Sequence, residues 1–486
     1  MSYRSLLVII IFAALIPLFA AEYGRLSAYF LDLKGPTILP HEGYPRGIGL
    51  APVTIKLDIS DSAAGLHEIS VWTRQGHETK DFLQKKFPIS HLIEKLSLDF
   101  NGPTSKLKEG EVEVIVRAID ASWWRNAAEL IIPLVVDFSK PKIEIITKVP
   151  SPIKENEAEL VFYRASDNKL ALSGIKIENT FSPGVPARHI DSDLNDDSFF
   201  VCLFSVPAGS RQHSTRLIGE DLVGNSMSEA LNFNIERKIS NRTERKISKE
   251  LLAEHFKKVI DVNSLRIDKV KQRLKAKTES FSSDVETNLN LEKFKILNEA
   301  LRVAMNEEFL AQINNGARID RCWNDVFLKP SHEIKSGFGD EVTYTFEGKA
   351  VSGYRQFGYE FAASLESRSV LAANDGFIIL NGDFGPYGKV LAIDHGLGIV
   401  SMYGNLESTN ALRGEKVHKG QEIALAGSSG LLPPNSYYFE MRLNGDPIDA
   451  EEWWNPSKYD SKIKRPIDDL KRSLGIQILK PLERKF

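Results

Sequence analysis

Short runs of alternating apolar and polar residues dominate the first half of the chain. They cover residues 53–59, 68–72 and 113–118, and turn-forming residues separate them. Because the side chains of a strand point alternately to the two faces of a sheet, this period of two predicts strands with one buried face. The glycines and prolines of residues 22–45 predict an extended linker before the first strand.

A second copy of the strand pattern follows about 100 residues further on. In it, Ser166-Asp167 matches Ser60-Asp61, and Asp221 matches Asp120. Repeated short strands predict two tandem β-sandwiches, over residues 46–138 and 139–237, and the pattern resembles the immunoglobulin-like modules of bacterial surface proteins. Four aspartates of the second copy are predicted to be solvated loop residues, with a calcium site as the alternative: Asp191, Asp193, Asp196 and Asp197.

Residues 238–318 show a helical period instead. Apolar residues recur three and four positions apart, and fourteen Lys and Arg face seven Asp and Glu between Glu236 and Glu279. This pattern predicts amphipathic helices with a basic outer face. Two interpretations remain open: a helical hairpin packed between domains, or helices that cover the groove of the following domain or bind a partner.

Residues 319–460 return to strand-like runs, now separated by many glycines, and predict a compact antiparallel β-domain. The remaining residues, 461–486, form a charged tail with a predicted short helix at 467–474 and a strand after it. The predicted fold class is therefore mainly β and multidomain.

The β-domain carries a collinear series of motifs, namely Ser336-Gly337-Phe338-Gly339, Ala373-Asn374-Asp375-Gly376, Tyr387-Gly388, Ile393-Asp394-His395-Gly396 and Phe439-Glu440-Met441-Arg442-Leu443-Asn444-Gly445. In these it resembles the lysostaphin-like (LytM) zinc endopeptidases, which cut peptide cross-links in bacterial cell walls. The resemblance implies the fold of that family and, in active members, one catalytic zinc.

The zinc chemistry does not carry over to this sequence. Gln356, Glu360 and Tyr438 stand where the family has its zinc ligands, and Asn405 and Ser436 replace its two catalytic histidines. One carboxylate cannot hold zinc at useful affinity, and an amide and a hydroxyl cannot serve as general bases near neutral pH. We therefore expect neither bound zinc nor catalytic residues, and a structural role for His395.

A groove shaped for a peptide can still bind one after its metal is lost. Aromatic and hydroxyl side chains suit stacking and hydrogen bonding to such a ligand. The candidates for lining the groove are Phe357, Tyr359, Glu360, Asn405, Ser436, Tyr437 and Tyr438.

The pattern of the N-terminus predicts that the chain is exported from the cytoplasm. Arg4 precedes an apolar run over residues 6–21, which predicts a cleaved signal peptide or an uncleaved membrane anchor. The protein is then periplasmic, anchored to the inner membrane, or secreted. A net charge of -3 argues against nucleic acid as a partner, and Cys202 and Cys322 are predicted to be small buried thiols with no disulfide between them.

Three functions remain open. The first is a non-catalytic cell-envelope protein that binds peptidoglycan or regulates a cell-wall hydrolase. The second is a divergent zinc endopeptidase that uses Glu360 with relocated ligands such as Asp394 or Glu440. The third is an immunoglobulin-like interaction protein with a structural C-terminal cap.

Overall fold

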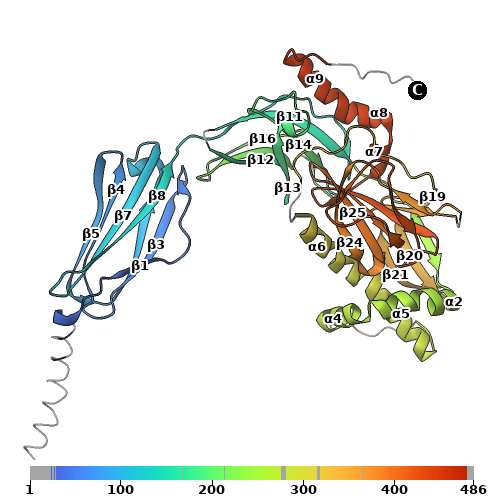
Figure 1. Ribbon diagram of the computed structural model, residues 1–486, viewed down its shortest axis with the longest axis horizontal. Coiled ribbons are helices and arrows are strands. Elements are labelled where there is room, and N and C mark those ends of the chain that lie inside the picture. Colours follow the sequence, from blue (N-terminus) through green and yellow to red (C-terminus); the bar gives the residue numbers. More distant parts are fainter. Residues whose placement is uncertain are drawn as a thin grey trace, which may run out of the picture. The chain divides into compact units, whose positions relative to one another are not determined.

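The computed structural model describes residues 23–478, apart from residues 24–26, 28, 168, 213, 275–280, 315–317 and 365. These residues form two compact units (Figure 1). Unit 1 comprises the described residues within Met1–Pro141, Asp167–Ala171 and Glu220–Met227, and unit 2 comprises the other described residues. The predicted signal peptide or anchor, residues 1–21, lies outside the described residues. Among those described, no helix has the length and apolarity needed to cross a membrane.

Unit 1 contains two sheets around one apolar core. One sheet has the strand order β1-β3-β6 and the other has the order β2-β8-β7-β4-β5. Buried residues of both sheets belong to the core. The three predicted strands are confirmed as parts of β3, β4 and β7. Residues of the predicted linker form strand β1, which pairs with β3. The strands are β1 Thr37–Pro40, β2 Gly47–Ile48, β3 Val53–Ser60, β4 Leu66–Gln75, β5 Glu78–His91, β6 Ile93–Phe100, β7 Gly110–Asp120 and β8 Ala127–Val136.

The next strands form a seven-stranded sheet of order β16-β15-β12-β13-β14-β11-β9 and a short pair, β10-β17. Buried residues of β11 and β14 belong to the same apolar core as the C-terminal β-domain. The immunoglobulin-like assignment of both β regions remains a prediction. The strands are β9 Lys142–Ile145, β10 Ile153–Lys154, β11 Ala158–Ser166, β12 Leu170–Ile177, β13 Thr180–Pro186, β14 Phe199–Ser205, β15 Thr215–Asp221, β16 Ser226–Ala230 and β17 Ile235–Glu236.

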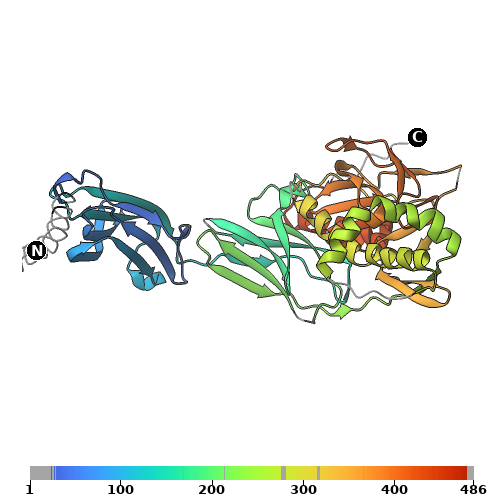
Figure 2. The same ribbon diagram turned by 90° about the horizontal axis from the view of Figure 1, so that it is seen from below.

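The segment predicted to be helical opens with a strand, β18 (Arg242–Lys246), which pairs in parallel with β20. Its helices then pack against the C-terminal strands, as Figure 2 shows from below. They are α2 Lys249–Leu251, a π-helical turn Leu252–Phe256, α3 Lys257–Val262, α4 Ser264–Leu274, α5 Val285–Asn298 and α6 Ala300–Asn314.

The C-terminal β-domain is built on a sheet of order β19-β22-β30-β26-β25-β24-β28, with β31 beside β30. Two smaller sheets, β18-β20-β21 and β23-β29-β27, complete it. The strands are β19 Glu333–Ser336, β20 Glu341–Phe346, β21 Lys349–Arg355, β22 Tyr359–Ala362, β23 Ser369–Leu371, β24 Gly376–Asp383, β25 Lys389–Gly396, β26 Ile399–Gly404, β27 Leu406–Thr409, β28 Lys416–Val417, β29 Glu422–Ala426, β30 Ser436–Leu443 and β31 Asp446–Ile448.

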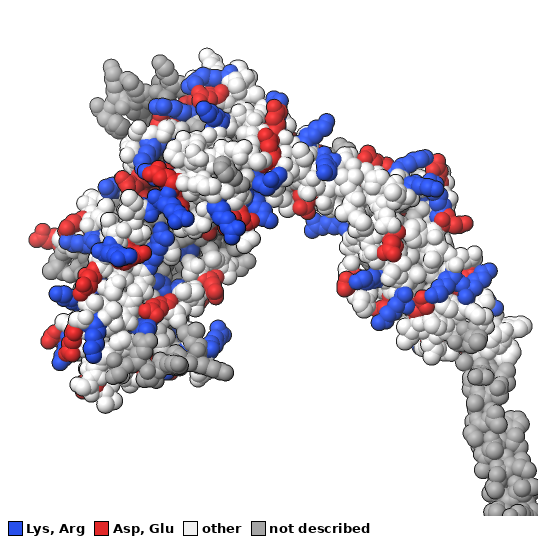
Figure 3. Space-filling model, turned by 180° about the vertical axis from the view of Figure 1, so that it is seen from behind, with Lys and Arg blue, Asp and Glu red and all other residues white. Residues whose placement is uncertain are grey.

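Helices α7 (Ala450–Trp454), α8 (Pro456–Tyr459) and α9 (Arg465–Ser473) follow the sheet. The predicted helix in the tail is confirmed as α9, and it packs on β11 through Ile467 and Leu470. Lys and Arg are interspersed with Asp and Glu over the face drawn in Figure 3. Cys202 and Cys322 are both free thiols; Cys202 is buried as predicted, whereas Cys322 is only half-buried.

Candidate functional site

The pairing of β22 with β30 brings three of the predicted site residues to one face of the sheet. In this antiparallel pair Glu360 lies opposite Tyr438, and Ala362 lies opposite Ser436. Successive side chains of a strand point to opposite faces. Glu360, Tyr438 and Ser436 therefore share one face, while their neighbours Tyr359 and Tyr437 point to the other.

The carboxylate of Glu360 is already paired with a cation. Its Oε2 accepts a hydrogen bond from Nη2 of Arg245, and both side chains are largely withdrawn from solvent. Arg245 comes from β18 and also lies over the ring of Tyr344, 5.9 Å from its centroid. A buried carboxylate requires a counter-charge, and here the guanidinium of Arg245 supplies it.

Gln356 is buried and carries an amide in place of an imidazole. Its Oε1 accepts a hydrogen bond from Oη of Tyr354 at 3.0 Å, and its main-chain N–H donates to Asp340. Its Nε2 finds no hydrogen-bond partner among the described residues. An amide nitrogen donates hydrogen bonds and does not present the lone pair that a metal requires.

Tyr438 keeps its phenolic proton. Its Oη donates to Oε2 of Glu440 at 2.5 Å, and Glu440 in turn accepts from Nε of Arg442. Burial, and then the charge of Glu440, raise the pKa of Tyr438 well above its ordinary value. A phenol held protonated in this way is a hydrogen-bond donor and not a ligand.

Asn405 and Ser436 hold the loop that precedes β30. Nδ2 of Asn405 donates to the carbonyl of Ser436 at 2.8 Å, and its Oδ1 accepts from the main-chain N–H of Gly430 at 2.7 Å. The Ser436 hydroxyl donates to the carbonyl of Pro433 at 2.5 Å. The two residues predicted to replace the catalytic histidines of the family thus make structural hydrogen bonds.

These residues do not fit the catalytic zinc of the family. Such a zinc is held by three imidazole, thiolate or carboxylate groups, with one position left open for water. Here the three positions offer an amide, a carboxylate neutralised by Arg245, and a protonated phenol. The alternative ligands also have other partners: Asp394 accepts from the main-chain N–H groups of Arg318 and Gly396, and Glu440 is paired with Arg442.

The predicted aromatic lining of the groove is not assembled on one face, because neighbouring residues of a strand alternate. The Tyr359 hydroxyl donates to Asp449 on the opposite face, at 2.5 Å. The ring of Tyr437 packs there against Phe361 and His332. Phe357, just before β22, is partly exposed.

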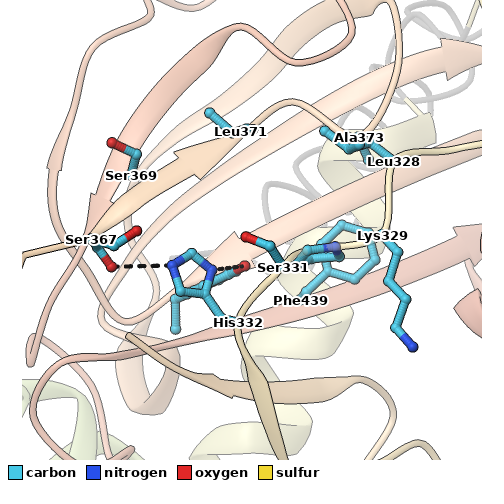
Figure 4. A pocket seen from close by; sticks show the side chains of 11 residues that line it. Leu328, Lys329, Ser331, His332, Ser367, Ser369, Leu371, Ala373 and Phe439 are labelled. Atoms are coloured by element: carbon cyan, nitrogen blue, oxygen red, sulfur yellow. Dashed lines mark hydrogen bonds between the residues drawn. The ribbon is translucent and has the colours of Figure 1, made fainter. Parts of the chain in front are cut away.

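Each face of this sheet borders a cavity. On the Glu360 face, a cavity of about 510 Å³ is lined by Arg245, Phe256, Tyr344, Glu360, Pro433 and Ser436, among others. The opposite face borders a smaller one of about 180 Å³, drawn in Figure 4. In the smaller cavity His332 lies between Ser367, whose carbonyl is 3.1 Å from Nε2, and Tyr437.

His395 has the structural role predicted for it. Its Nδ1 lies 2.7 Å from the carbonyl of Asp375, and its Nε2 lies 2.7 Å from the hydroxyl of Ser401. Burial lowers its pKa to about 4, so the ring is neutral and donates from Nδ1.

Carboxylates close enough to share a cation do occur in unit 1. Asp32, Asp61 and Asp120 form one group and Asp137, Asp167 and Asp221 a second, and the oxygens of each group lie within 4.8 Å of one another. In each copy of the repeat, the two aspartates that match between the copies lie close to each other. The third aspartate of each group, Asp32 or Asp137, comes from the segment that precedes that copy. The predicted loop aspartates behave differently, since Asp191 and Asp193 both pair with Lys471 of α9.

Arg245 is the site residue that the sequence did not reveal. The basic composition of its surroundings indicated a helix, whereas the run Arg242-Thr243-Glu244-Arg245-Lys246 forms β18. The available signal was its alternation, which places Thr243 and Arg245 on one face of the strand.

Comparison with known proteins identifies the C-terminal domain. Residues 354–450 match the model of peptidase family M23. Over 106 residues the chain is 35% identical to the murein hydrolase activator EnvC of Escherichia coli, a match covering 22% of this chain and 25% of that protein. The peptidoglycan DD-endopeptidase ShyA of Vibrio cholerae is 21% identical over 312 residues, covering 60% of this chain and 63% of that protein.

A solved structure, the putative peptidase M23 from Pseudomonas aeruginosa, aligns with 61% of this chain and 92% of its own at 15% identity and a TM-score of 0.35. The matched regions cover less than two thirds of the length of EnvC and of ShyA. These relatives include both a peptidoglycan endopeptidase and an activator of murein hydrolases.

Proposed function

Since residues 354–450 form a peptidase family M23 domain, we propose that this chain is a non-catalytic cell-envelope protein which acts by binding a cell-wall hydrolase or peptidoglycan itself. The observation that carries the proposal is the ion pair between Arg245 and Glu360, at the position of a family zinc ligand. A carboxylate neutralised by a guanidinium, beside a neutral amide and a protonated phenol, supplies no metal-activated water. We place the protein in the periplasm, with residues 6–21 as its membrane anchor.

Similarity to a murein hydrolase activator favours the hydrolase as partner. The cavity beside Glu360 is lined by both apolar and charged side chains, which suits a peptide or protein segment. In this account the domain keeps the shape of a peptidase and works through its surface.

The test uses the purified full chain. We expect less than one zinc per chain after incubation with zinc and dialysis, and no fragments released from dye-labelled peptidoglycan. We also expect the chain to increase dye release by a purified peptidoglycan amidase. One zinc per chain together with released fragments would overturn the proposal.

The second candidate, a divergent zinc endopeptidase, is favoured by the similarity to ShyA and to the DD-carboxypeptidase/endopeptidase Mpg of Neisseria meningitidis, which is 32% identical over 124 residues. The same experiment separates the two candidates. If the enzyme account holds, Glu360→Ala abolishes both zinc binding and cleavage.

A further inference from the structure

Unit 1 exposes large apolar side chains at one end of its sheets. Trp123 and Trp124, in the turn between β7 and β8, are 61% and 58% exposed. Three segments contribute to this surface, which we call the aromatic patch: Tyr29, Phe30, Leu31 and Leu33 before β1, Leu92 and Ile93 at the start of β6, and Trp123 and Trp124.

Strand register places these segments together. Leu66, at the start of β4, pairs with His91 at the end of β5 and with Asp120 at the end of β7. Residues that follow His91 and Asp120 therefore emerge at the same end of the sheet. The segment before β1 reaches this end as well, because the main-chain N–H of Trp123 donates to the carbonyl of Tyr29 at 2.8 Å.

The patch is an ordered surface. Nε1 of Trp124 donates to the carbonyl of Phe30 at 2.9 Å. Ring centroids of Phe30 and Trp123 lie 5.7 Å apart, and those of Tyr29 and Phe30 lie 5.0 Å apart. Ordered aromatic rings held in contact with water are unfavourable, and a contiguous exposed apolar surface of this kind marks an interaction site.

The sequence before the patch indicates what covers it. The apolar run of residues 6–21 ends eight residues before Tyr29. Eight residues span at most about 28 Å in any conformation, so an anchored run holds the patch close to the bilayer surface. Tryptophan and tyrosine are enriched at the membrane–water interface, where an amphipathic ring lies between acyl chains and headgroups. In Figure 3 this end of unit 1 shows mainly uncharged atoms.

We propose that the aromatic patch docks on the membrane interface and lays this end of unit 1 on the lipid headgroups. The inference rests on the membrane location proposed above, and it adds a second membrane contact, made by folded residues far apart in sequence. A single apolar segment tethers a chain, whereas inserted aromatic side chains also fix the orientation of the unit at the surface.

The test measures tryptophan fluorescence of the full chain in nanodiscs of phosphatidylethanolamine and phosphatidylglycerol, with plain or brominated acyl chains. The three tryptophans Trp323, Trp453 and Trp454 are buried in unit 2, and Trp72 is half-buried in β4. Bromine quenches only nearby indoles. We expect brominated lipid to lower the emission, and the double variant W123S/W124S to lose this lipid-dependent quenching.

Two further variants keep both reporter tryptophans. Leu92→Ser with Ile93→Ser is expected to weaken the quenching, because it removes two exposed apolar side chains from the same end of the unit. The matched control Ile239→Ser, at a 90% exposed position of unit 2, is expected to leave it unchanged. The near-ultraviolet circular dichroism of each variant reports whether unit 1 remains folded.

Unquenched emission from the anchored chain would overturn the proposal. A blue-shifted but unquenched emission would show that protein covers the patch, either a second copy or another partner, and would overturn it equally. A chain that fails to enter nanodiscs refutes the proposed anchor alone. The free chain is then mixed with brominated vesicles of the same lipids, and quenching supports the docking surface while its absence overturns it.

Discussion

At the residue scale, His395 is a neutral imidazole enclosed by the fold. Because its pKa is lowered from 6.5 to about 4 by burial, the unfolded chain takes up a proton below about pH 6.5, whereas the folded chain resists it down to about pH 4. Its contribution to stability is therefore present above pH 6.5 and lost as the pH falls through this window. The linked loss amounts to about 3 kcal/mol.

His395→Gln should remove this part of the pH dependence. We expect the free energy of unfolding of the wild type, measured in urea, to fall more steeply between pH 6.5 and pH 4 than that of the variant. Equal slopes for the wild type and His395→Gln would show that burial does not hold the ring neutral.

At the scale of the element, β18 carries two arginines that lie in contrasting surroundings. In the ion pair of Arg242 with Glu341, the side chains are 89% and 54% exposed. In the ion pair of Arg245 with Glu360, they are only 16% and 3% exposed. Removing one partner of a buried pair leaves a buried charge uncompensated, and costs about 3–5 kcal/mol. Removing an exposed partner costs at most about 1 kcal/mol.

We therefore expect Arg245→Ala to lower the melting temperature of unit 2 sharply, and Arg242→Ala to change it little. Calorimetry of the full chain measures both. Because the two substitutions lie on one short strand, loss of strand propensity would affect them alike. Similar shifts for the two variants would mean that Glu360 does not depend on Arg245 for its charge balance.

The contrast between β18 and the other strands shows which strands can be predicted from the sequence. Strands with one apolar face, such as β3 and β7, can be predicted from the alternation of apolar and polar residues, because burial of the apolar face stabilises them. Strand β18 alternates only polar residues, and its place is set by pairing with β20, a long-range contact. The motifs predict the altered ligand positions, whereas Arg245, which pairs with Glu360, lies on β18, before the first motif in the sequence.

The groove residues illustrate a second limit. Tyr359 and Glu360 are adjacent in sequence, yet only Glu360 borders the larger cavity, since β22 directs them to opposite faces. A list of polar and aromatic residues around a motif therefore includes every second residue wrongly, because those side chains point to the opposite face of the sheet. The register of strand pairing shows which residues face the cavity.

At the scale of the whole molecule, the helical segment decides how accessible the larger cavity can be. Its buried residues share one apolar core with strands of the C-terminal domain, including Tyr344 and Tyr438. Phe294 of α5 lies at its centre, with ring centroids 4.7 Å from Phe256 and 5.0 Å from Tyr344. Helices held by a common core are expected to open together with the domain and not as a separate cover.

Hydrogen exchange tests this expectation directly. We expect amides of α5 to exchange as slowly as those of β25, because both are released only by unfolding of the shared core. Phe294→Ala removes a fully buried ring and should cost about 3–5 kcal/mol, accelerating exchange in α5 and β20 by a common factor. Leu289→Ala, at an exposed position of the same helix, should change neither. Acceleration confined to α5 would instead show that the helices detach while the sheet stays folded, and the cavity beside Glu360 would then be open to partners in that state.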